Sequence, residues 1–452
     1  MRGKALSDDY ITEGSILKGM LLFFLPIMCG TLLQQLYNTA DAIIIGRALG
    51  TEALAAVGGS SGRITSLLVN FFVGVSSGAA VIVAQYFGAG NKPQLRRSIY
   101  TGVLLALASG CTVMILGLTL RVPLLTAMNT TADTIGLSAA YLGVYFLGMI
   151  PTILYNMGSG IMRAMGDSRR PLYYLIVCVA ANVVFDMLFV LKFHWGVEGA
   201  AAATALSQVI CAVLVLHALC RLPEEYRLRM ERANFDPKAL KRMLQIGLAA
   251  GTQGAMYSIA NVVLQSAVNK LGTNSMAGWT AFNKIDDFYW PICGAIGTAV
   301  MTFVGQNYGA GKYDRMRRSI RVGMALHVSA SLLASAILYT LRYQAIRLFV
   351  EGEPEVIEIG TQLMMICLAY ALFSPTEVYS SAMRGVGNTL RPMLITVLSV
   401  CGLRLAYLWL YGFVHASNMV IAVIYPISWA AASTGFLLYY KFGDWMPKRK
   451  VE

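Results

Sequence analysis

The sequence predicts an all-α polytopic membrane protein in which twelve transmembrane helices form two pseudo-symmetric six-helix lobes. Three observations support this fold class: the composition, a series of apolar stretches and an internal repeat. Of the 452 residues, 57% are hydrophobic and only 13% are charged, which is more apolar surface than a soluble core of this size could bury. Lipid is therefore the expected surrounding of most of the chain.

Stretches of about 20 apolar residues, enough to cross roughly 30 Å of hydrocarbon, recur along the whole sequence. We place the spans at residues 17–45, 53–84, 98–120, 134–158, 171–191, 197–220, 240–268, 275–304, 318–341, 357–381, 392–411 and 417–440. The polar segment before the first span is too long for a signal peptide, so we expect this span to stay as a membrane helix.

The basic residues predict the orientation of the chain. Most of the 36 Lys and Arg residues lie near the N-terminus, in alternate connections between the spans and in the C-terminal tail. The positive-inside rule then puts both termini in the cytoplasm, in a multi-pass protein of the plasma or inner membrane. The net charge of +13 follows from this topology. Nucleic-acid binding would need the basic residues gathered on one folded surface, whereas here their expected neighbours are anionic headgroups of the lipid bilayer.

The internal repeat has an offset of 221 residues, the distance from Val83 to Val304. At this offset VAQYFGAGNKPQLRRSI aligns with VGQNYGAGKYDRMRRSI, and IMRAMGDSRRP aligns with AMRGVGNTLRP, both without a gap. Six spans per unit give both units the same orientation, the parallel-repeat arrangement of secondary transporters, which rock about a site between two bundles. We expect an N-lobe of residues 1–220, a cytoplasmic linker of residues 221–239 and a C-lobe of residues 240–452.

Signatures of catalysis and of cofactor binding are missing. The sequence has no HExxH motif, and the eight cysteines stand singly, without a CxxC pair or a histidine spacing that suits zinc. The two Gly-Ala-Gly turns lack the GK[ST] of a phosphate loop and are expected to be tight helix connections. We therefore predict that the chain is not an enzyme and has no cofactor.

Polar residues inside the predicted N-lobe spans form a candidate site. Charges in spans are costly and mark functional sites, and two neighbouring carboxylates can take up a proton or exchange it for Na⁺. The first span carries a polar stripe at i, i+3, i+4 and i+7, which we expect to line a cavity: Gln34, Tyr37, Asn38 and Asp41. The predicted ion-coupling set, also the possible Na⁺ ligands, is Asp41, Asn182, Asp186 and Thr204. The alternative is that each Asp only satisfies a helix end or a polar neighbour, and Thr204 is a weaker candidate because threonine commonly bonds its own helix.

The second half breaks the symmetry of the site. With an offset of 220 residues, Asn261 stands where the first half has Asp41, and Arg404 lies in the region that matches Asn182 and Asp186. An unpaired buried arginine would be very costly. We therefore predict an ion pair between Arg404 and one of the remaining acids, with a role in substrate binding as the alternative. These acids are Asp286, Asp287 and Glu377.

These residues resemble the multidrug and toxic compound extrusion (MATE) family, and most closely its DinF-like branch. The resemblance rests on LPIMCGTLLQQLYNTADAIIIGRALGTEALAAVG, on both pairs of repeated turns and on NVVFDMLF. It implies export of amphipathic organic cations driven by H⁺ or Na⁺, with the coupling site in the N-lobe. It also adds Asn156 as a cavity residue. The other main bacterial branch has a Glu in the seventh span where this chain has Tyr257, and an Asp about one turn from Glu377, so a C-lobe Na⁺ site of that kind is in doubt.

Two other functions are alternatives to efflux. A flippase for a lipid-linked glycan of the same superfamily often has fourteen spans and a strongly cationic cavity, so twelve spans and acidic N-lobe residues favour efflux. An intramembrane enzyme has no sequence support. We expect small organic cations as substrates and a protein that works as a monomer in the bilayer; the sequence chooses neither the coupling ion nor the substrate.

Overall fold

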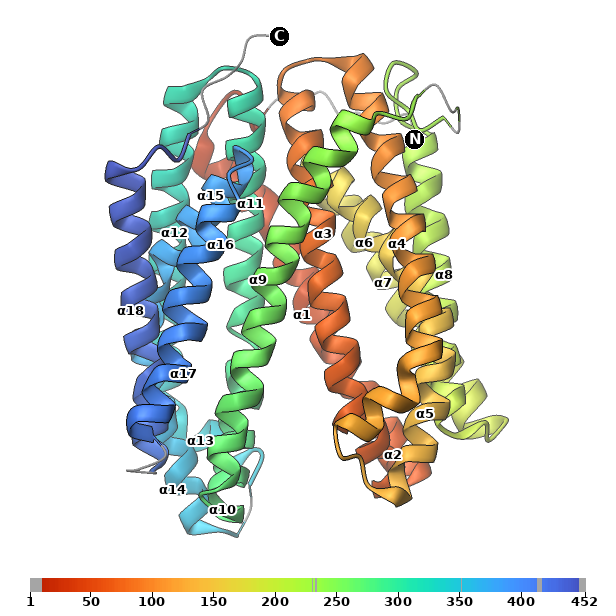
Figure 1. The fold of residues 1–452 in the computed structure, drawn as a ribbon, viewed down its shortest axis with the longest axis vertical. Coiled ribbons are helices and arrows are strands. Elements are labelled where there is room, and N and C mark those ends of the chain that lie inside the picture. The colour runs from red at the N-terminus through yellow and green to blue at the C-terminus, as the bar shows by residue number, and fades with distance from the viewer. Residues whose placement is uncertain (1–9, 230, 232–233, 351, 413–416, 447–452) are drawn as a thin grey trace. The chain divides into compact units, whose positions relative to one another are not determined.

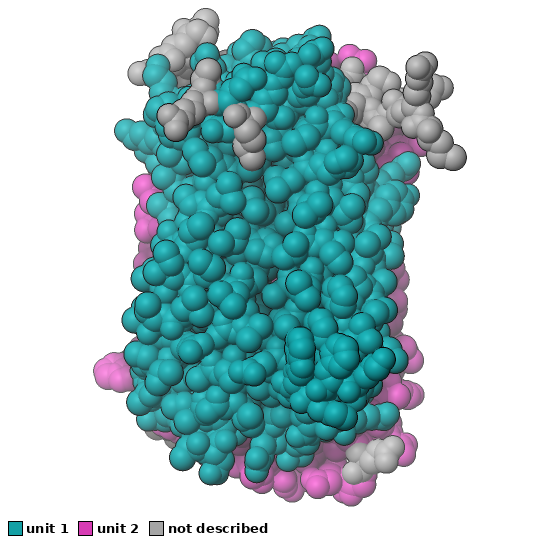
Figure 2. Space-filling view, turned by 90° about the vertical axis from the view of Figure 1, so that its right-hand side faces the viewer, with its two compact units in different colours: residues 1–8, 25–251 teal, residues 9–24, 252–452 magenta. Residues whose placement is uncertain are grey.

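The computed structural model describes residues 10–229, 231, 234–350, 352–412 and 417–446. These residues form helices and connecting turns, and no strand occurs among them. They divide into two compact units: unit 1 takes residues 25–251 and unit 2 takes residues 10–24 and 252–446 (Figure 2). The two chain ends, on which the predicted orientation partly rests, lie outside the described residues.

The helices account for the predicted membrane spans. Within the described residues, ten helical segments are long and apolar enough to cross a membrane, and α5 (Ala132–Leu147) and α6 (Met149–Ala164), bent by 50°, make an eleventh. The twelfth is α9 (Pro237–Asn269), which has 33 residues but no stretch as apolar as the others. All twelve overlap the stretches expected from the sequence.

Unit 1 is built around α6, which packs against three other helices (Figure 1). These are α3 (Gly62–Gly88), α4 (Lys92–Ala127) and α8 (Gly196–Cys220). A second layer is formed where α7 (Arg169–Asp186) packs on α8. The short helix α2 (Thr51–Ala56) and the π-helical turn η1 (Val57–Ser61) precede α3 and pack on α5.

Unit 2 repeats this plan with more interruptions. Its helices α11 (Trp290–Gly309), α12 (Tyr313–Thr340) and α18 (Asn418–Phe442) all pack against α15 (Ser374–Gly385), as Figure 1 shows for α12 and α18. The remaining helical pieces are α10 (Thr273–Asp286), α13 (Arg342–Arg347), α14 (Pro354–Leu363), η4 (Met364–Phe373), α16 (Leu390–Thr396), η5 (Val397–Gly402), α17 (Leu403–Tyr407) and η6 (Leu408–Gly412).

Two long helices pass from one unit to the other. The helix α1 (Ile16–Leu49) belongs to unit 2 up to Phe24 and to unit 1 from Leu25 onward, next to Pro26. The helix α9 does the reverse, because it belongs to unit 1 up to Gly251 and to unit 2 beyond it. The lobe boundaries drawn from the sequence assign each of these helices to a single lobe and do not anticipate the exchange.

Glycines permit the contact of α9 with α3. A Cβ atom added to Gly78 would lie 2.2 Å from the carbonyl oxygen of Met243, and one added to Gly74 would lie 2.4 Å from the amide nitrogen of Gly251. The reverse holds for Gly247, whose added Cβ would lie 2.6 Å from a backbone oxygen of α3. Both helices therefore present glycines four residues apart, the spacing that lets membrane helices approach backbone to backbone.

Candidate ion-binding site

The carboxyl groups of Asp41 and Asp186 meet inside unit 1. Asp41 is half-buried on α1, and Asp186 is only 2% exposed at the end of α7. The two carboxyl groups lie close enough to interact electrostatically. Two ionised carboxylates this close repel each other, and neither has a hydrogen to donate to the other. A proton between them, or a cation in its place, would relieve this repulsion.

Several polar atoms around this pair have no partner. Within the described residues, four buried polar atoms here have no hydrogen bond: one carboxyl oxygen of Asp41, one of Asp186, and the side-chain oxygen and nitrogen of Asn182. Asn182 itself has an exposed fraction of 0%. Buried polar groups are nearly always satisfied in folded proteins, and exceptions point to a function or to a bound ion or water. Oxygen ligands of this kind suit Na⁺ as well as a proton.

The backbone departs from an α-helix directly beside the pair. The helix α7 ends at Asp186 and continues as the π-helical turn η2 (Met187–Lys192). Single π-turns inside α-helices occur frequently at functional sites. The turn η6 occupies the equivalent place in the second repeat, 221 residues further on, where Tyr407 replaces Asp186. The backbone feature is thus shared by both repeats, while the carboxylate belongs to the first.

The other predicted N-lobe residues occupy different positions around the pair. Tyr37 bridges the stripe on α1 to α8: its hydroxyl oxygen lies 3.4 Å from that of Thr204 and its ring also neighbours Asp41. Gln34 and Asn38 are exposed. Asn156 is half-buried on α6, where its amide nitrogen donates to the carbonyl oxygen of Thr152 at 2.9 Å. The structure therefore brings Tyr37, Asp41, Asp186 and Thr204 together.

Two tyrosines beside the site were not among the predicted residues. Tyr141 and Tyr145 of α5 stack with their ring centres 5.8 Å apart. Tyr141 lies near both Asp41 and Asp186, and both tyrosines lie near Tyr37. Their spacing of four residues puts them on one helix face, and this spacing was the feature of the sequence that could have identified them. Aromatic residues are common on apolar membrane helices, however, so that signal has little specificity.

Arg404 forms no ion pair, and the prediction that an acid holds it is wrong. Within the described residues, no carboxylate oxygen lies within 4.0 Å of its guanidinium. Instead Nε donates to Ser428 Oγ at 3.0 Å, Nη1 donates to Asn261 Oδ1 at 3.5 Å, and the guanidinium lies 4.4 Å from the centre of the Tyr425 ring. Hydrogen bonds to neutral oxygen atoms and a cation–π contact therefore stabilise this cation.

The acids of unit 2 have partners of their own. Asp286 accepts hydrogen bonds from the Tyr370 hydroxyl and, at 2.7 Å, from the Trp290 indole nitrogen. Glu377 accepts one from Ser381 at 3.2 Å on the same helix. Asp287 is exposed.

Tyr257, on α9, is half-buried and interacts electrostatically with both Glu377 and Arg404. In unit 2 the predicted residues are therefore spread over separate small networks rather than one site. No group of three or more His, Cys, Asp and Glu side chains suited to a metal ion occurs in the part of the chain that the structure describes.

Two repeated helical units and twelve helices of membrane-spanning length, within the described residues, are the architecture of a polytopic membrane transporter. The model of the MatE family matches residues 26–188 and 250–410, one copy in each repeat, and the chain belongs to this family. The resemblance seen in the sequence is thereby confirmed, as are the twelve-span fold and the prediction that the protein is a transporter and not an enzyme. The assignment to the DinF-like branch stays a prediction.

Known relatives match nearly the full length of the chain. Two proteins of Bacillus subtilis (strain 168) are similar: "Probable multidrug resistance protein YoeA", 27% identical over 97% of this chain and 96% of its own, and "Probable multidrug resistance protein YpnP", 29% identical over 96% and 97%. Among solved structures, an outward-facing multidrug resistance MATE family transporter of the MOP superfamily has a TM-score of 0.89 and 23% identity, covering 97% of this chain and 98% of that one. This structural likeness shows the fold.

Proposed function

We propose that the protein exports small amphipathic, mainly cationic organic compounds by alternating access, in exchange for H⁺ or Na⁺ bound at Asp41 and Asp186. The observation that carries the proposal is the carboxyl pair with unsatisfied polar atoms around it in unit 1. The names of the two Bacillus relatives support an organic compound as cargo. The basic residues near the chain ends and in alternate connections support a cell-membrane protein with both termini in the cytoplasm.

The chemistry of the site explains how an ion and an organic cation could be exchanged. A proton or Na⁺ satisfies the facing carboxyl oxygens, and Asn182 can add its side-chain oxygen. A positively charged substrate would be attracted by the same carboxylates once the ion has left. A lipid-linked pyrophosphate would be repelled by them, which disfavours the flippase alternative at this site.

Proteoliposomes with separately imposed ion gradients test this function. The purified protein would be reconstituted as the only protein, and export of a fluorescent organic cation would be followed with a pH gradient alone and with a Na⁺ gradient alone. We expect one of the two gradients to drive uphill movement of the dye, with liposomes lacking protein as the control. If neither gradient moves the dye, and a fluorescent lipid-linked sugar is flipped instead, the proposed function is wrong.

A further inference from the structure

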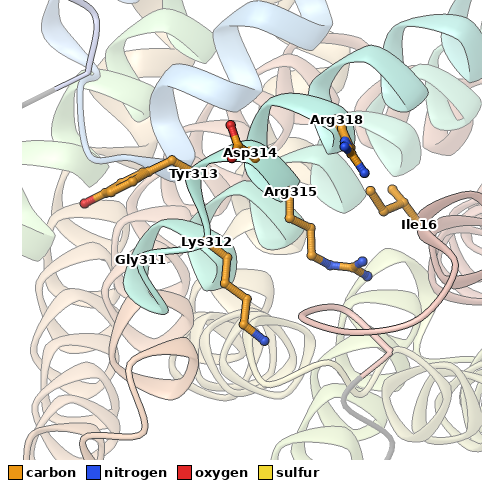
Figure 3. A pocket seen from close by; sticks show the side chains of 7 residues that line it. All are labelled: Ile16, Gly311, Lys312, Tyr313, Asp314, Arg315 and Arg318. Atoms are coloured by element: carbon orange, nitrogen blue, oxygen red, sulfur yellow. The ribbon is translucent and has the colours of Figure 1, made fainter.

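A basic pocket lies in unit 2 where α12 begins. Its volume is about 410 Å³, and its lining residues are Ile16, Gly311, Lys312, Tyr313, Asp314, Arg315 and Arg318 (Figure 3). Lys312, Arg315 and Arg318 follow one another at three-residue spacing and extend toward the same side, whereas Tyr313 and Asp314 point away from them. The lining therefore combines three cations with the apolar side chain of Ile16 and one acid, Asp314, whose side chain points away from the cations.

Two of these cations are held in place without losing much of their positive charge. Arg315 donates to four backbone carbonyl oxygens, those of Tyr10 at 3.3 Å, Ile11 at 3.0 Å, Glu13 at 2.5 Å and Gly14 at 2.8 Å. Carbonyl groups are neutral, so these bonds fix the guanidinium but leave its charge.

Lys312 donates to the carbonyl oxygen of Thr12 at 3.1 Å, and its one acidic contact among the described residues is with the exposed Glu13 carboxylate at 3.5 Å. Such an exposed pair is weak. Arg318 is exposed and, among the described residues, has no carboxylate within 4.0 Å.

The equivalent turn of unit 1 is covered and partly neutralised. Lys92 forms an ion pair with Glu225 at 2.5 Å, and Arg96 donates to the carbonyl oxygens of Glu224 at 3.2 Å and Glu225 at 2.9 Å. Arg97, which matches Arg318 at the repeat offset, is exposed as Arg318 is. Arg97 and Arg318 are therefore equivalent arginines, but the turn that carries Arg97 is partly neutralised and the turn that carries Arg318 is not.

We propose that the pocket of unit 2 binds the phosphate headgroup of an anionic phospholipid. It lies at the first turns of α1 and α12, both of which are long and apolar enough to cross a membrane. A pocket at the ends of such helices is at the level of lipid headgroups. Basic pockets between membrane helices on the positively charged side are suited to phosphate-bearing lipids. Ile16 and the exposed Leu17 offer apolar contact for the upper part of an acyl chain.

Native mass spectrometry of the full-length protein with added phosphatidylglycerol tests this site. The variants are Arg318→Gln and its repeat counterpart Arg97→Gln, which make the same charge change at matched places. We expect Arg318→Gln to weaken binding of the first phosphatidylglycerol about fivefold, since a basic residue near a lipid surface contributes about 1 kcal/mol. A further Lys312→Gln change should add a similar factor, and Arg97→Gln should leave binding unchanged.

Two further arms decide the identity of the ligand and the folding of the variants. Phosphatidylcholine should bind the wild-type protein more weakly than phosphatidylglycerol, and millimolar inorganic phosphate should not displace the lipid. Melting temperatures without added lipid should be equal for wild type and both variants. Equal weakening by Arg97→Gln and Arg318→Gln, no preference for phosphatidylglycerol, or displacement by inorganic phosphate would each overturn the proposal.

Discussion

Asn182 shows how one residue can be unfavourable for stability and suited to function. It is fully buried and both polar atoms of its side chain lack a partner. Each such buried orphan costs about 1–3 kcal/mol. An apolar residue of similar volume would avoid this cost, so the amide makes sense as one wall of a site that a cation or a water molecule completes. The same argument applies to the unpaired carboxyl oxygens of Asp41 and Asp186.

Asp41→Asn should abolish ion-driven export and leave the fold intact. The amide keeps the shape of the side chain and can hydrogen-bond Asp186, but it cannot release or bind a proton. The measurement is dye export from proteoliposomes under whichever ion gradient drives the wild type, with the melting temperature in detergent as the test of folding. Asp133→Asn, which changes an exposed acid of unit 1, is the control and should transport at the wild-type rate. Ion-driven export at that rate by Asp41→Asn would rule out Asp41 as the coupling residue.

Ser428→Ala should destabilise unit 2 through Arg404. The serine accepts the shortest hydrogen bond of this buried cation, 3.0 Å from Nε, and hydrogen bonds to charged groups contribute about 1.5–3 kcal/mol. We expect a lower melting temperature in detergent. Ser258→Ala is the control, because that hydroxyl bonds only a carbonyl of its own helix, and its melting temperature should stay near the wild-type value. Equal melting temperatures for wild type and Ser428→Ala would mean that Tyr425 and Asn261 are enough to stabilise the buried Arg404 side chain.

At the scale of residues, the sequence predicted the acidic residues of the candidate site but not the side chains around them. The i, i+4 and i+7 spacing on α1 and α7 identified Tyr37, Asp41 and Asp186, because an intramembrane charge is rare enough to be informative. It could not show that α5 supplies Tyr141 and Tyr145. It also misled for Arg404, since the rule that a buried cation needs an anion left out the aromatic ring and the neutral oxygens that tertiary packing brings to it.

Among the helices, the pair α3 and α9 shows the tightest fit. Gly74 and Gly78 face Gly247 and Gly251, with backbone atoms of one helix where side chains of the other would begin. In a membrane, close packing replaces the hydrophobic effect as the force that joins helices. This contact therefore fixes the first part of α9 to unit 1, and the remainder of α9 continues into unit 2.

Gly78→Ala should loosen this contact. The new Cβ would lie 2.2 Å from the Met243 carbonyl oxygen, so the backbones must separate, at a cost of about 1–3 kcal/mol for overpacking. The readout is thermal melting in detergent, where we expect a lower melting temperature. Gly136→Ala on α5 is the matched control: its Cβ meets no atom within 4 Å, and alanine favours a helix by about 1 kcal/mol over glycine. A melting temperature for Gly78→Ala at or above that of Gly136→Ala would show that the helices do not touch as described.

The exchange of half-helices was beyond the reach of sequence patterns. Apolar length predicts that α1 and α9 span the membrane, and the repeat predicts that they are equivalent. Neither says which neighbours each half contacts, because hydropathy is the same toward lipid and toward another apolar helix. The glycine spacing on α3 and α9 was visible in the sequence, but only the structure identifies the two motifs as partners.

For the molecule as a whole, the free energy of the ion gradient limits how far the proposed exchange of one coupling ion can drive substrate export. A pH difference of one unit supplies about 1.4 kcal/mol per proton, and 100 mV adds about 2.3 kcal/mol for each charge moved. A single ion can therefore support only a modest uphill gradient of substrate. Coupled export also requires that the ion and the substrate are not bound at the same time. A ligand shifts a conformational equilibrium only through its different affinity for the two states.

In the proposed function, competition at the carboxyl pair meets this requirement, and it gives a pH dependence with a definite sign. Protonation of Asp41 or Asp186 removes negative charge, so the affinity for an organic cation should fall as the pH falls, and Na⁺ should lower it if Na⁺ uses the same oxygens. The measurement is titration of a fluorescent organic cation onto detergent-solubilised protein across pH, with and without Na⁺. Asp186→Asn should bind more weakly at high pH and respond less to pH, whereas Asp133→Asn should follow the wild type. Wild-type affinity that is flat with both pH and Na⁺ would exclude direct competition in unit 1, and coupling would then have to involve Asp286 or Glu377 in unit 2.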